Sequence, residues 1–180
     1  MAIILDGNIG VTYPDVTTQN TSAIVSGKLP TTRLPAGSVL QVVSATTTTS
    51  VSISSSSYTD TGLSASITPT SSSSKILILV YQSYRYTAAA VGGGILIFRN
   101  SSNLTTANAD AIGPYQLYSP TGQDMYSVFA ASFLDSPATT SSTTYKTQAR
   151  PYNTAGSMVF QNNGPNANSM STITLMEIAA

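Results

Sequence analysis

Few residues in this chain are suited to chemistry. Its 180 residues include no histidine and no cysteine, so the common general bases, zinc ligands and thiol nucleophiles are missing. Paired carboxylates can still hydrolyse a glycosidic bond, and the chain has seven: Asp6, Asp15, Asp60, Asp110, Asp124, Asp135 and Glu177. No spacing among them makes a catalytic pair. We therefore expect a protein that is not an enzyme, with no catalytic residue, no metal and no cofactor.

Several carboxylates have a simpler explanation than catalysis. Asp60 lies in the turn-like stretch 58–62, and Asp135 ends an apolar stretch just before a Ser-Pro pair. Both positions are typical of turn formers. Asp110 and Asp124, near the ends of a long polar segment, are the least implausible catalytic pair, and they keep a glycan depolymerase as a third hypothesis.

Glu177 needs a separate explanation because it shares strand parity with Ile173 and Leu175. That parity places a carboxylate on an apolar face, where it must be paired or hydrogen-bonded. We expect it to pair with an Arg or Lys of a neighbouring strand or subunit. The alternative is a frayed strand end at which Glu177 is in water.

The charge pattern argues against two kinds of partner. Lys plus Arg number seven and Asp plus Glu number seven, so the chain lacks the basic surface that nucleic-acid binding needs. No apolar run approaches the roughly 20 residues that span a bilayer, and the first residues do not resemble a secretion signal. We expect a soluble cytoplasmic product that neither binds nucleic acid nor inserts into a membrane.

The surface must be polar without being charged. Charged residues make up 8% of the chain, against roughly 25% in ordinary soluble domains. Serine and threonine supply the polarity, in runs at 46–49, 54–57, 71–74 and 139–144. Their side chains compete for backbone hydrogen bonds and so disfavour long helices.

The chain divides into two parts. Residues 1–35 are interrupted by Gly, Asn, Thr and Pro, which prevents a long regular element and favours an extended N-terminal arm. Residues 36–180 repeat β-branched and aromatic stretches between turn signals, the pattern of an all-β, antiparallel β-sandwich head. We place its strands at 38–46, 51–57, 63–68, 75–87, 93–100, 125–135, 144–153, 157–162 and 170–178.

Two of these strands are apolar at consecutive positions, over 76–81 and 95–98. Both faces of each strand would then need cover, and the sequence offers no amphipathic helix to supply it. A partner subunit is the first explanation and burial under the segment 101–124 is the second. The residues expected at a subunit interface are Ile76, Ile78, Val80, Ile95, Ile97 and Glu177. Between the two strands, Gly92-Gly93-Gly94 predicts a bend or a close backbone approach.

The segment 101–124 reads as a long loop, and loops of that length are often functional. Its aromatic and amide side chains suit an adaptable binding surface. The candidates for receptor binding are Asn103, Asn108, Tyr115, Gln116 and Tyr118. The alternative is that the tyrosines pack onto the sheet.

The stretch 5–15, LDGNIGVTYPD, with Thr17, Thr18 and Gln19 after it, resembles the opening of tail-fibre-like proteins of marine and cyanobacterial phages. The stretches 34–42, 67–78 and 171–178 also look like segments of such proteins. The resemblance implies a homotrimeric fibre with a jelly-roll-like head and an arm that attaches to other virion proteins of the tail, baseplate or capsid. The arm residues expected to anchor it are Ile3, Ile4, Leu5, Val11, Tyr13 and Pro14.

These observations lead to two main functional hypotheses. The first is a short tail fibre or appendage in the virion, made in the host cytoplasm, that helps attachment by binding a host-surface glycan. Neutral hydroxyl, amide and aromatic groups suit such a ligand, and many copies strengthen weak binding. The second is a capsid decoration, cement or head-fibre protein that binds no receptor.

Overall fold

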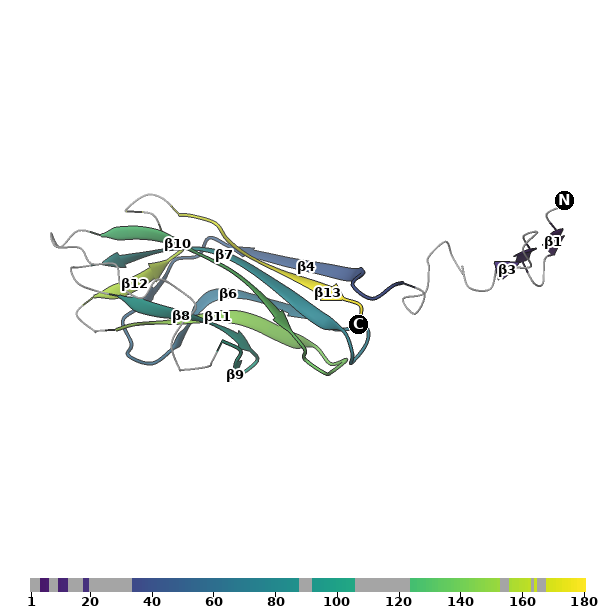
Figure 1. The fold of residues 1–180 in the computed structure, drawn as a ribbon. Helices are drawn as coiled ribbons and strands as arrows, with labels where there is room; N and C mark the ends of the chain where they lie inside the picture. Colours follow the sequence, from purple (N-terminus) through teal and green to yellow (C-terminus); the bar gives the residue numbers. More distant parts are fainter. Residues whose placement is uncertain are drawn as a thin grey trace. The chain divides into compact units, whose positions relative to one another are not determined.

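A computed structural model describes residues 34–87, 92–105, 124–152, 156–162, 164 and 168–180, together with the backbone of three short strands before them. The chain forms two compact units, Met1–Ser38 with Ala179 and Val39–Ile178 with Ala180. Every regular element in the described residues is a strand and every pairing is antiparallel (Figure 1). The prediction of an all-β, antiparallel fold is confirmed.

The first unit is not a single extended arm. Its strands β1 (Ile4–Asp6), β2 (Gly10–Thr12) and β3 (Thr18–Gln19) pair antiparallel in one small sheet. The chain therefore reverses direction twice within this segment. Of the predicted anchoring residues, Ile4, Leu5 and Val11 lie on these strands, while Ile3, Tyr13 and Pro14 lie outside the described residues. Anchoring stays a prediction.

The second unit is a β-sandwich of two sheets. The first sheet has the order β4-β13-β7-β12-β5, with β10 paired to the other edge of β7, and the second has the order β6-β11-β8-β9. The strands are β4 (Val39–Thr47), β5 (Val51–Ile53), β6 (Thr59–Ile67), β7 (Lys75–Thr87), β8 (Gly93–Arg99), β9 (Ser102–Asn103), β10 (Met125–Asp135), β11 (Thr143–Pro151), β12 (Ser157–Phe160) and β13 (Ser171–Ile178).

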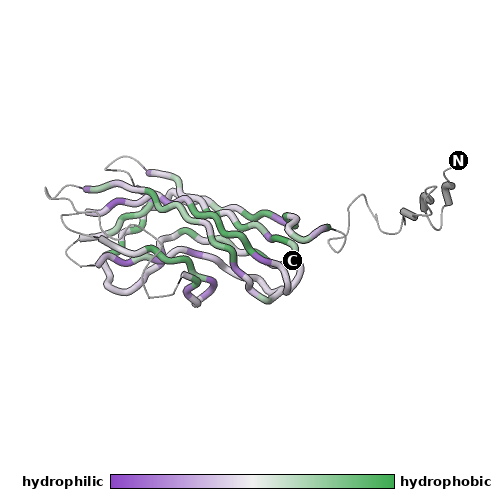
Figure 2. The backbone as a smooth tube through the Cα atoms, viewed as in Figure 1, coloured by the Kyte–Doolittle hydropathy of each residue, from purple (hydrophilic) through white to green (hydrophobic). Residues whose placement is uncertain are grey.

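Period-two alternation builds the core between the sheets. On β11, Tyr145 and Ala149 are fully buried while Lys146 and Arg150 reach solvent, as the alternation predicts. Figure 2 shows the most apolar residues along the long strands of the sandwich. Burial of this continuous apolar face is the main source of the sandwich's stability.

The doubly apolar strands do not form a subunit interface in the predicted way. Ile76 and Ile78 are 0% exposed and Val80 is 4% exposed within this single chain, because their face of β7 packs into its own core. The same holds for Ile95 and Ile97 of β8, at 1% and 0%. It is the opposite face of β7 that turns outward.

Glu177 was also expected at that interface, paired to a cation, and both expectations are wrong. The residue is 0% exposed. Its carboxylate accepts hydrogen bonds from Gln41 Nε2 at 2.6 Å and from the Thr70 backbone N and Oγ1, each at 2.7 Å. Neutral donors of its own chain satisfy this charge, which ties β13 to β4 and to the loop before β7.

Two further features join the sheets. Asp135 of β10 accepts from Arg99 Nη1 at 3.0 Å and from the Tyr145 hydroxyl at 2.7 Å, both on the second sheet. Burial and the nearby Asp135 carboxylate raise the pKa of Tyr145. In the core, Gln82 bonds to the hydroxyls of Thr61 and Thr147, each at 2.8 Å. These satisfied polar groups fix the alignment of the sheets.

The glycine run at the start of β8 makes the close approach that the sequence predicts. A Cβ placed on Gly93 would lie 2.7 Å from the Arg150 carbonyl oxygen and against the Met158 sulfur. Only glycine lets β8 pair with β11 at this point.

Candidate functional site

The outward face of the first sheet carries a groove between β7 and β10. Residues opposite each other on paired strands share a face, and here Val128 lies opposite Ser83 while Tyr126 lies opposite Arg85. The segment before β13 forms one side of the groove. Its lining comprises Tyr81, Ser83, Tyr126, Ser127, Val128, Ser169 and Met170, around a volume of about 570 Å³. That size is within the usual range for small-ligand sites.

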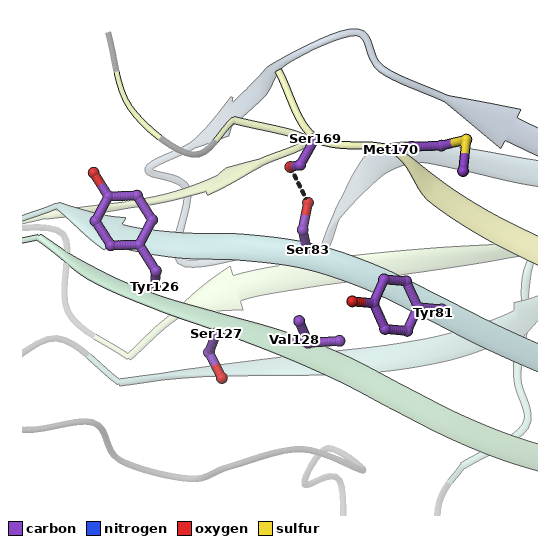
Figure 3. Close-up of a pocket in the computed structure, with 7 residues that line it drawn as sticks. All are labelled: Tyr81, Ser83, Tyr126, Ser127, Val128, Ser169 and Met170. Atoms are coloured by element: carbon purple, nitrogen blue, oxygen red, sulfur yellow. Dashed lines mark hydrogen bonds between the residues drawn. The ribbon is translucent and has the colours of Figure 1, made fainter. Parts of the chain in front are cut away.

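Two tyrosine rings stand at the ends of this groove. Figure 3 shows Tyr126 and Tyr81 on either side of Ser83, with Val128 between them on the β10 side. Tyr81 is 53% exposed and Tyr126 is 51% exposed, which leaves their rings accessible for contact with a ligand. Arg85, opposite Tyr126, is four residues from Tyr81 along β7, or about 13 Å of strand. The groove is thus long enough for a short oligomeric ligand.

Hydroxyl groups form the polar part of the groove. The Ser83 hydroxyl is hydrogen-bonded to that of Ser169 (Figure 3), which holds the segment before β13 against β7. Ser127 also lines the groove, but it lies opposite the core-facing Tyr84, so its hydroxyl is on the other face of the sheet. Each hydroxyl has one donor proton and two acceptor lone pairs, so Ser83 and Ser169 together retain capacity for a polar ligand.

Among the residues that the structure describes, no carboxylate or cation lines the groove. The nearest charges described are Arg85, beside Tyr126, and Asp124, just before β10, and these two form an ion pair with each other. Charge there is locally neutralised. The arrangement suits a neutral ligand with both apolar and hydroxyl surfaces.

Large aromatic side chains support the groove from the core side. Tyr84, next to Ser83 on β7, is 0% exposed, and burial raises its pKa. Its ring meets Tyr86 edge-on, at 5.5 Å between centroids, and lies 5.9 Å from the Phe160 ring. Such packing makes a stiff base for the outward side chains.

The predicted receptor residues are largely outside the described part of the chain. Asn108, Tyr115, Gln116 and Tyr118 fall there, so their role stays a prediction. Asn103 lies on β9, and its side-chain oxygen accepts from Thr105 N at 2.9 Å and from Thr105 Oγ1 at 2.8 Å. It is therefore engaged in a local turn, away from the groove.

The described carboxylates are each engaged with a partner. Asp60 binds Lys146 and Gln148 on β11, and Asp124 binds Arg85. Asp110, the other member of the proposed catalytic pair, lies outside the described residues. Within the described ranges no three acidic residues gather as metal ligands, and no helix there is long and apolar enough to cross a membrane.

Sequence reasoning missed the groove although it predicted both strands that form it. Tyr81 ends the apolar run at the parity of Leu77 and Leu79, and Tyr126 lies within the predicted strand 125–135. The available signal was this shared outward parity. Tyr81 and Tyr126 come together only when β7 and β10 pair, and these strands are far apart in the sequence.

No protein-family model matches this chain, and no curated protein matches it either. Any functional conclusion therefore rests on the residues and their geometry.

Proposed function

We propose that this chain is a virion structural protein of a tailed bacteriophage, a short tail fibre or appendage that contributes to host attachment by binding a neutral surface glycan. The observation that carries the proposal is the groove with two exposed tyrosines, the paired hydroxyls of Ser83 and Ser169, and no charged residue in its described lining. It replaces the loop 101–124 as the first candidate for the binding site.

The chemistry of the groove matches that of a sugar. A pyranose ring has an apolar face of C–H groups, which packs against an aromatic ring, and a rim of hydroxyls, which needs donors and acceptors. Tyrosine supplies a large and rigid amphipathic contact at low cost in conformational entropy. Tyr81 and Tyr126 are placed to contact two sugar units of one glycan, while Ser83 and Ser169 meet its hydroxyls.

The binding is expected to be weak at one site and strong on the particle. An open groove on a sheet face buries little of its ligand, so one copy alone holds a glycan loosely. Several linked copies raise the effective concentration and can increase overall affinity by roughly 10²–10⁴-fold. A multimeric appendage, a homotrimer in our proposal, fits this requirement.

The order of the strands supports a jelly-roll-like head. Numbered along the chain, the eight main strands are β4, β6, β7, β8, β9, β10, β11 and β13. Neighbours in the first sheet are then the first, eighth, third and sixth, and in the second sheet the second, seventh, fourth and fifth. This is the pairing of an eight-stranded jelly roll built from two Greek keys.

A second function, capsid decoration without receptor binding, is favoured by a different observation. Several large apolar side chains on the outward face of the first sheet are half exposed, among them Val42 and Leu134. A cement protein would bury them against neighbouring capsid subunits. Under that reading the purified protein binds no glycan, and its position on the particle is between capsid subunits.

Glycan binding is tested by applying the purified full-length protein to an array of bacterial surface polysaccharides and neutral oligosaccharides. We expect binding to a subset, weakened at least tenfold by Tyr81→Ala and by Tyr126→Ala. Tyr152→Ala is the matched control, because Tyr152 is an exposed tyrosine that follows β11 of the other sheet. Absence of binding to any glycan, or equal loss in the control, would contradict the proposal.

A further inference from the structure

The outward face of the first sheet has a second feature, at the end opposite the groove. The strand register places Val42, Met176, Leu77 and Leu134 in one row across four neighbouring strands. Neighbouring strands are about 4.8 Å apart, so this row crosses about 14 Å of sheet. We call it the apolar stripe.

The apolar stripe is uncovered in the described part of the chain. Val42 is 55% exposed and Leu134 is 50% exposed, while Leu77 and Met176 between them are partly exposed. Such a contiguous patch is unusual on a protein that stays monomeric, and it marks an interaction surface. Hydrophilic residues border it, since Ser44, Thr174 and Ser132 lie in the next row with Leu79. An apolar centre with a polar rim is the usual anatomy of a protein interface.

Charge narrows the identity of the partner. Among the described residues of this face, Lys75 borders the stripe in the next row with Ile178, while Arg85 is eight residues from Leu77 and is paired with Asp124. The four residues of the stripe carry no charge, so its centre offers no complementarity to a strongly acidic or basic partner. It does meet a copy of itself without like-charge repulsion, which is what an interface between identical subunits requires.

The edge of the sheet gives a second, independent argument for a copy of this chain. β10 pairs over eleven residues with β7 and, among the described residues, with no other strand. Free edge strands are normally protected by charges, prolines or bulges. From Met125 to Leu134 the strand has none of these. An unprotected edge next to the stripe fits a surface that is covered when subunits assemble.

We infer that copies of this chain associate through the apolar stripe, with Val42, Leu77, Leu134 and Met176 at the centre of the interface. The groove remains open in this arrangement, because Tyr81, the groove residue of β7 nearest the stripe, is four residues from Leu77, or about 13 Å of strand. One face then serves both assembly and ligand binding, at its two ends.

The test is the mass of the full-length protein by light scattering over a range of concentrations. We expect more than one chain per particle at micromolar concentration, and a monomer for the double variant Val42→Lys/Leu134→Lys. Two unpaired charges at the centre of the interface should raise the dissociation constant at least about 30-fold. The matched control is Ser52→Lys/Thr59→Lys, which adds the same charge at exposed positions away from the stripe.

Folding controls and several possible results decide whether the stripe is the interface. Circular dichroism checks that the variants fold. If Val42→Lys/Leu134→Lys does not fold, Val42→Ser/Leu134→Ser, which adds no charge, takes its place. A wild-type monomer at every concentration would overturn the inference, and so would a variant with the wild-type mass. A monomer that binds purified virions through the stripe would also overturn it, by naming another virion protein as the partner. A monomeric variant should still bind glycan through the groove, which separates this inference from the proposed function.

Discussion

Glu177 illustrates, at the scale of one residue, how this protein keeps a charge in its interior. Burial alone would raise the pKa of a carboxyl group, but the hydrogen bonds from Gln41 and Thr70 favour the charged form and leave the pKa of Glu177 lowered from 4.5. The donors are neutral, so no second buried charge is required. This explains how a chain with so few charges tolerates a fully buried carboxylate.

The lowered pKa sets the direction of a pH dependence. A group whose pKa falls on folding stabilises the protein above its unfolded pKa, and that stabilisation is lost as the pH falls through the folded pKa. We expect Glu177→Gln to lower the free energy of unfolding at pH 7 by about 2 kcal/mol, because the amide presents an N–H group to the Thr70 donors. The difference from wild type should narrow below about pH 4.5.

Urea denaturation of both proteins at a series of pH values between neutral and acidic measures this difference. Other carboxylates titrate in both proteins and cancel in the comparison. A difference that stays constant with pH would show that the carboxylate charge has no part in stability.

For a single residue such as Glu177, the sequence predicted which face of the strand the side chain lies on. It did not predict which groups hydrogen-bond to that side chain. The parity of Glu177 with Ile173 and Leu175 correctly placed its carboxylate on the apolar face. Its partners come from β4 and from the loop before β7, distant positions that parity does not select. The expected cation was wrong for that reason.

At the scale of strands, the sequence was most informative where side chains alternate or where long runs are apolar. The predicted strands 75–87 and 125–135 coincide with β7 and β10. The short strand β9 was missed because two residues carry no periodicity. Consecutive apolar residues on β7 suit either face, so only pairing with β10 and β13 decides which side enters the core.

Gly93 tests the packing of two strands. Gly93→Ala would push a methyl group against the Arg150 carbonyl and the Met158 sulfur, and β8 would have to move away from β11. We expect a loss of about 2 kcal/mol in the free energy of unfolding, typical of overpacking. Chemical denaturation measures it.

Gly37→Ala is the comparison for this variant. Gly37 has φ of +88° with no atom within 4 Å of the added carbon, so only backbone strain of roughly 1 kcal/mol opposes the change. A Gly93→Ala protein as stable as wild type would mean that β8 and β11 are not held as close as described.

At the scale of the whole sandwich, one sheet face combines two surfaces of different chemistry. The apolar stripe lies where β13 ends, and the groove with Tyr81 and Tyr126 lies toward the other end of β7. The second face of the same sheet fills the core. Assembly through the stripe would present several grooves on one particle, which is how a weak neutral site becomes an effective attachment device.

The sequence pointed to these two proposed surfaces only in outline. Low charge, strands apolar on both faces and exposed aromatics indicated a multimeric binding protein, but the interface was assigned to the core-facing residues Ile76, Ile78 and Val80. The opposite parity, Leu77 and Leu79, carries the outward apolar surface. The error was one residue of register, which exchanges the two faces of a strand.

The most direct measurement is fluorine NMR of protein labelled with fluorotyrosine, titrated with an oligosaccharide that the array selects. The chain has ten tyrosines and no tryptophan, so each signal is assigned with a single Tyr→Phe variant. The account predicts saturable shifts for Tyr81 and Tyr126 and none for the buried Tyr84 and Tyr145. Shifts confined to Tyr115 and Tyr118, or no saturable shift at all, would contradict binding in the groove.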